Sequence, residues 1–62
     1  MTAKTIRNLV HIHKKRITVD AVKTLMRRIS IEYLTDTQVV SIISTAVYKA
    51  GKGSTVLRED VY

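Results

Sequence analysis

The stretch that decides the fold runs from Thr18 to Gly51 and reads TVDAVKTLMRRISIEYLTDTQVVSIISTAVYKAG. It contains no Pro and no internal Gly, and its apolar residues recur at three- and four-residue steps, the spacing of one helix face. A continuous helix of this length would be roughly 48 Å long at 1.5 Å per residue. Such a helix cannot bury its apolar stripe against the short flanks of a 62-residue chain. The stretch therefore predicts an obligate dimer.

A polar segment, residues 35–38, interrupts this stripe. Thr35 and Gln38 stand at the spacing of a capping box, a signal that begins many helices. Two interpretations follow. Either the helix runs through with these residues facing solvent, or one helix ends near Leu34 and another begins at Asp36. The absence of Gly and Pro favours the continuous helix.

The flanks of the stretch predict its boundaries. Thr18 is a good N-cap residue, and Asp20 suits the positive end of a helix. Gly51 and Gly53 allow the left-handed backbone that commonly ends one. The expected elements of this single all-α domain, residues 1–62, are a helix at about 4–13, a loop at about 14–17, the long helix at about 19–50, a loop at about 51–56 and a short helix at about 57–62.

The charge of the chain is unevenly placed. The formal net charge is +6, and residues 4–28 hold eight basic side chains against a single acid, Asp20. Such asymmetry is typical of a face that meets polyanions, above all nucleic acid. Without Cys, thiolate chemistry is excluded, and no catalytic or metal-binding motif stands out. We expect a soluble intracellular protein that is not an enzyme, with no cofactor, no metal, no small-molecule substrate and no membrane contact.

Two short motifs in this layout resemble the histone fold. The run Lys15-Arg16-Ile17-Thr18 resembles the first histone loop, a basic pair before an aliphatic residue and the Ser/Thr that opens the central helix. Residues 50–56, AGKGSTV, followed by Glu59-Asp60-Val61, resemble the second loop and the start of the third helix. Arg7 falls where archaeal histones carry an arginine. The chain resembles the short single-domain histones of some bacteria and archaea more than typical histones.

The chain also departs from the histone pattern. The separation of Arg16 and Thr55, 39 positions, is about one helical turn longer than in a typical histone. The extra turn reflects either a longer central helix or a break near residues 35–38. Gly53 stands where histones often carry an arginine, and the third helix is short.

The resemblance implies a function and a set of site residues. It implies a homodimer, in some cases a tetramer, that binds double-stranded DNA through its phosphates without reading sequence and compacts or coats it in the nucleoid. In such a dimer the first loop of one chain lies beside the second loop of the other. The expected DNA-binding residues are Arg7, Lys14, Lys15, Arg16, Thr18, Lys52, Ser54 and Thr55. The expected dimer-interface residues on the apolar stripe are Leu25, Ile29, Tyr33, Val40, Ile43 and Val47.

Two other functions remain open at this stage. A small helix-turn-helix-like transcriptional regulator would have its chain broken near residues 35–38 and would prefer one DNA sequence. A histone-fold heterodimerisation module would need a different partner chain to fold.

Overall fold

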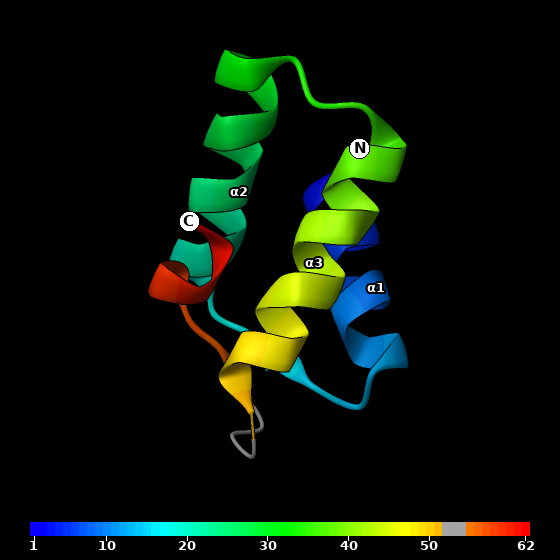
Figure 1. Cartoon of the computed structure of the whole chain (residues 1–62), viewed down its shortest axis with the longest axis vertical. Coiled ribbons are helices and arrows are strands. Elements are labelled where there is room, and N and C mark those ends of the chain that lie inside the picture. Colours follow the sequence, from blue (N-terminus) through cyan, green and yellow to red (C-terminus); the bar gives the residue numbers. More distant parts are fainter. Residues whose placement is uncertain (52–54) are drawn as a thin grey trace.

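The computed structural model describes residues 1–51 and 55–62, and this part of the chain forms a small, mostly helical domain (Figure 1). Two short strands and a 3-10 turn accompany three α-helices of 10, 14 and 15 residues. In chain order the elements are α1 (Ala3–Ile12), β1 (Arg16–Ile17), α2 (Val19–Glu32), α3 (Asp36–Ala50), β2 (Thr55–Val56) and the 3-10 turn η1 (Arg58–Val61).

Each α-helix begins in the same way. A threonine hydroxyl oxygen accepts a hydrogen bond from the backbone N–H three residues later, which satisfies one of the donors that a helix start leaves unpaired. The pairs are Thr2 with Thr5, Thr18 with Ala21, and Thr35 with Gln38. The first helix begins at Ala3, one residue before the predicted start at about residue 4. The N-cap predicted at Thr18 is confirmed.

The continuous helix predicted over residues 19–50 is wrong. The helix ends at Glu32, and Tyr33 takes a left-handed conformation with φ 52° and ψ 47°. A full capping box then opens α3, because the Thr35 N–H donates to Gln38 Oε1 at 2.9 Å and the Gln38 N–H donates to Thr35 Oγ1 at 3.2 Å. The histone-type order of a short, a long and a short helix is accordingly not what this single chain forms.

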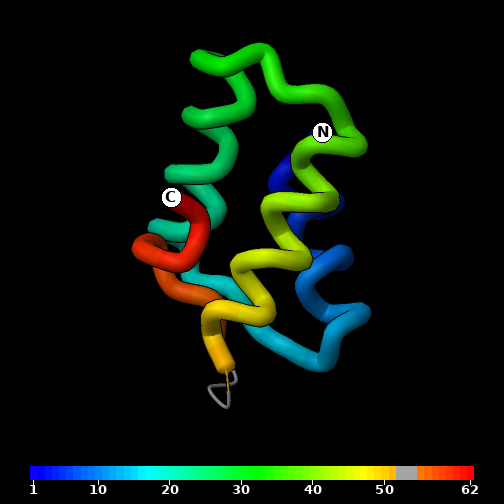
Figure 2. The backbone as a smooth tube through the Cα atoms, viewed as in Figure 1, coloured from blue at the N-terminus to red at the C-terminus, as the bar shows by residue number. Residues whose placement is uncertain are grey.

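The break lets the chain pair its own two strands. After residues 33–35 reverse the direction of the chain (Figure 2), β2 lies parallel to β1, with Arg16 opposite Thr55 and Ile17 opposite Val56. The Thr18 N–H extends the pairing by donating to the Val56 carbonyl at 3.1 Å. The contact between the first and second loops, expected between two chains, is therefore made within one.

The core lies where α1 and η1 pack against the two longer helices. Among the described elements, α2 and α3 make few direct contacts with each other, whereas α1 contacts both and so does η1. Burial of each large aliphatic side chain contributes about 1.5–3 kcal/mol. Among the described residues, the core cluster of buried side chains consists of Ile6, Val10, Val22, Leu25, Val39, Ile43, Ala46, Val56 and Val61.

Arg28 on α2 joins the 3-10 turn η1 to this helix through a hydrogen bond. Arg28 Nη1 donates to the Val61 carbonyl at 2.8 Å, and Arg28 Nε donates to Glu32 Oε2, also at 2.8 Å. This hydrogen bond to the guanidinium holds the pKa of the Glu32 carboxyl below its ordinary value. The short third helix expected at 57–62 is a four-residue 3-10 turn, Arg58–Val61, which Arg28 binds through the Val61 carbonyl.

The residues predicted for a dimer interface divide into three groups in the single chain. Leu25 and Ile43 are buried in its own core, and Ile29 and Val47 are half-buried. Tyr33 is 89% exposed and Val40 is 42% exposed. Their assignment to a dimer interface stays a prediction.

Candidate nucleic-acid interface

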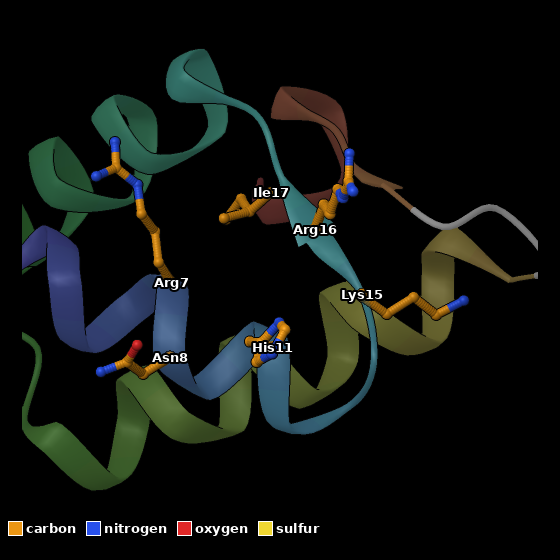
Figure 3. Close-up of a pocket in the computed structure, with 6 residues that line it drawn as sticks. All are labelled: Arg7, Asn8, His11, Lys15, Arg16 and Ile17. Atoms are coloured by element: carbon orange, nitrogen blue, oxygen red, sulfur yellow. The ribbon is translucent and has the colours of Figure 1, made fainter.

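An open groove of about 380 Å³ lies between α1 and β1. Three of the six residues that line it are cations, and Figure 3 shows the Arg7 and Arg16 side chains directed to the same side, with Ile17 between them in the view. Lys15 extends sideways in this view, toward the C-terminal end of α3, where its ammonium contacts the Gly51 carbonyl. The lining residues are Arg7, Asn8, His11, Lys15, Arg16 and Ile17.

Helical spacing directs one face of α1 into this groove. Ile6 and Val10 point into the core, so Arg7 and His11, each one residue later, stand exposed beside β1. His11 lies one helical turn after Arg7 on the same helix face. This spacing could have added His11 to the predicted site, which did not include it. Asn8, also outside the predicted site, completes that side of the groove.

A tight turn carries the chain from α1 into β1. Lys14 has a φ of 60°, and its backbone N–H donates to the His11 carbonyl at 2.8 Å. Lys15 follows, and its ammonium Nζ donates to the Gly51 carbonyl at 2.7 Å. That carbonyl lies at the end of α3, where the helix dipole favours a cation. The contact holds the basic loop against the C-terminal end of α3.

Two of the groove's cations, Arg7 and Arg16, form no ion pair with any residue that the structure describes. Within residues 1–51 and 55–62, the single ion pair joins Arg28 and Glu32, on α2. Arg7 and Arg16 are both exposed and take no part in it. Two guanidinium groups, each with several donors in a planar fork, can therefore bind anions from solvent, and phosphate fits this geometry well.

The structure brings together only part of the predicted DNA-binding set. Arg7, Lys15 and Arg16 line the groove, and Thr55 is paired with Arg16. Thr18 follows β1, but its hydroxyl oxygen caps α2. Lys14 is exposed on the turn before the groove. Lys52 and Ser54 lie outside the described residues.

The described residues offer little toward other kinds of site. No group of three or more His, Asp or Glu side chains among them could hold a metal ion. None of their helices combines the length and the apolar character needed to cross a membrane. Comparisons with protein-family models, with curated proteins and with solved structures find no match to this chain.

Proposed function

We propose that this chain is a binding protein, not an enzyme, that holds double-stranded DNA by its phosphate backbone without reading the sequence. The observation that carries the proposal is the groove between α1 and β1, where Arg7 and Arg16 stand exposed on opposite walls and neither forms an ion pair with a described residue. Cations that neutralise phosphates release condensed counterions, which supplies most of the affinity of sequence-independent DNA binding.

The geometry of the two strands supports phosphate binding. Because β1 is parallel to β2 and packs beside α1, Arg16 is fixed at one wall of the groove and Arg7 at the other. Lys15 adds positive charge at the same loop while its ammonium stays on the Gly51 carbonyl. Besides the three cations and Ile17, the groove is lined by a single amide, Asn8, and one imidazole, His11.

The histone resemblance adds an assembly to the proposal. The two stretches that carry it, residues 15–18 and 50–56, contain the paired strands β1 and β2. In histones such paired loops hold DNA, and the resemblance extends the proposal to a homodimer, or a tetramer, that compacts or coats DNA in the nucleoid.

The break between α2 and α3 favours a second candidate, the helix-turn-helix-like regulator. Its two helices are joined by three residues, as in that motif. Two observations speak for the first candidate instead. Few direct contacts join α2 and α3, whereas the two helices of the motif pack on each other. From Val39 to Lys49, α3 also carries no Asn, Gln or Arg, the side chains that make the bidentate contacts to adenine and guanine.

The deciding experiment measures DNA binding at about 50 mM and 200 mM salt with two duplexes of unrelated sequence. Backbone binding predicts equal affinities for the two duplexes and a steep fall with salt. A strong preference for one duplex would replace the first candidate by the regulator. Failure to bind either duplex at the lower salt concentration would refute both.

A further inference from the structure

The groove between α1 and β1 is larger than phosphate binding alone requires. Its volume of about 380 Å³ lies within the range of small-ligand pockets, about 300–1,000 Å³. A single phosphate group fills only a small part of that volume. The sequence predicted no small-molecule substrate, so the size of this groove is a finding of the structure. The other lining side chains therefore decide what else the groove can hold.

Three of the lining side chains end in flat polar groups. Arg7 and His11 lie one helical turn apart on α1, and Arg16 lies on β1 at the other wall. Guanidinium and imidazole planes both stack on nucleobases, and guanidinium also binds phosphate. Within residues 1–51 and 55–62, no hydrogen bond or ion pair engages these three side chains. The groove can therefore contact both the phosphate and the base of a nucleotide.

The uncharged part of the lining suits a base. The half-buried Ile17 lies between the two arginines in the view of Figure 3 and offers apolar surface to a ring. Asn8 stands on α1 beside it, and an asparagine amide can pair with the edge of adenine. The bases of an intact duplex are stacked and paired, so only an unpaired nucleotide can place its base here.

The walls of the groove are held in place by contacts that do not involve a ligand. Ile17 pairs with Val56, which is fully buried, and so ties β1 to the core. The Lys15 ammonium holds the start of β1 on the Gly51 carbonyl at 2.7 Å. On the other wall, the buried Ile6 anchors α1. The groove is therefore largely formed before binding, which lowers the entropy cost of holding a ligand.

We propose that the groove holds one nucleotide, its phosphate and its base together, which is either free or unpaired at the end of a DNA strand. The phosphate binds to Arg7 and Arg16, and the base stacks on the His11 ring with its edge beside Asn8. This inference rests on the proposed phosphate site and adds a base to it. Binding of an intact duplex through its backbone remains independent of sequence, because its paired bases do not enter the groove.

The first experiment titrates the protein with adenosine monophosphate, inorganic phosphate and adenosine, and follows the backbone amide signals by NMR. At about pH 8 imidazole is mostly neutral, so stacking is measured without a charge on the ring. Adenosine monophosphate should shift the signals of residues 7–11 and 16–17 in a saturable way. Its dissociation constant should be lower than that of inorganic phosphate by a factor of about five or more, because one stacked base contributes at least that much. Adenosine, which lacks the charge, should bind more weakly than its monophosphate.

A matched pair of histidine variants tests the stacking. His11 and His13 are both exposed, but His11 lines the groove and His13 does not. His11→Ala should raise the dissociation constant of adenosine monophosphate about fivefold more than that of inorganic phosphate. His13→Ala, which also loses one imidazole, should leave both constants unchanged. Asn8→Ala should act in the same direction as His11→Ala, because it removes the amide beside the base edge.

A pair of duplexes distinguishes the two sources of the nucleotide. Both have the same paired sequence, and one carries an unpaired adenosine nucleotide with a 5′-phosphate at each end. Tighter binding of this duplex than of the blunt one, with the gain lost in His11→Ala, identifies a strand end as the ligand. Equal binding of the two duplexes, together with tight binding of adenosine monophosphate, identifies a free nucleotide.

Three outcomes would overturn the nucleotide site. The first is adenosine monophosphate that binds no tighter than inorganic phosphate, and the second is a set of shifted signals outside the groove. The third is an equal effect of His11→Ala and His13→Ala on the binding of adenosine monophosphate. If salt-dependent duplex binding persists in these cases, the base pocket alone is refuted and the proposed function stands. A groove that binds neither phosphate nor nucleotide, in a protein that binds no duplex, refutes both.

Discussion

Removal of the two groove arginines should flatten the salt dependence of DNA binding by a predictable amount. In Arg7→Gln with Arg16→Gln, two exposed guanidinium groups are replaced by neutral amides that still donate hydrogen bonds. Each phosphate contact contributes about 0.9 to the slope of log K against log salt, so the double variant should lose about 1.8. Between about 50 and 200 mM salt, a fourfold change, this slope corresponds to a factor of about 12 in affinity. Wild-type binding should therefore weaken about 12-fold more than that of the variant across this window.

The assay is fluorescence anisotropy with one labelled duplex at several salt concentrations. The matched control is Lys49→Gln, which removes one positive charge from a separate hollow that Lys49 lines with Asp60 and Tyr62. Because Arg7 and Arg16 are exposed, the double variant should keep its stability within about 0.5 kcal/mol. An unchanged slope in the double variant, or an equal loss per charge in the control, would refute the assignment of the groove to phosphate.

Three further predictions concern stability. Leu25→Ala should lower the free energy of unfolding by about 2–5 kcal/mol in urea titrations because Leu25 is fully buried, and equal values for Leu25→Ala and the exposed Ile31→Ala would contradict this core. Thr35→Ala should lower the free energy of unfolding by about 1 kcal/mol because α3 loses its cap. An unchanged free energy would show that this cap does not stabilise the fold. Since the Glu32 pKa is lowered by Arg28, its contribution is present above the ordinary value of about 4.5 and is lost on acidification. The melting temperature of Glu32→Gln should fall less than that of the wild type between about pH 6 and pH 3, and parallel curves would contradict this.

Local signals in the sequence predicted the start of α2 and marked the start of α3 as an alternative to the continuous helix. The hydroxyl of Thr18 caps α2 as expected, and the spacing of Thr35 and Gln38 marks a real capping box. These signals succeed because they involve atoms three residues apart, whose geometry is set by the helix itself.

The continuity of the central helix could not be settled in the same way. The absence of Gly and Pro argued for one helix, yet a left-handed Tyr33 ends it. What decides the matter is distant in sequence: folding back lets α3 bury Val39 and Ile43 in the same core as Val22 and Leu25. Periodicity shows which residues must be buried, but it does not show whether they are buried by the same chain or by a partner.

The sequence predicted only part of the candidate site, because the rest depends on contacts between residues that are distant in the chain. The basic run identified Lys15 and Arg16, and Arg7 was placed with them through the histone resemblance. His11 and Asn8 were not in the predicted set because their place in the groove depends on β1 lying beside α1. That arrangement follows from pairing with β2, nearly forty residues later.

The parallel pairing of β1 with β2 also sets the order in which this chain can fold. Arg16 and Thr55 lie 39 positions apart, and closing a loop of that length costs about 3 kcal/mol in chain entropy. Helices of this size form in about a microsecond from local contacts, so α1, α2 and α3 can appear before the strands meet. We therefore expect strand pairing, which also brings Val56 into the core, to be the slow step. The folding rate should depend on residues at this junction more than on the helices it joins.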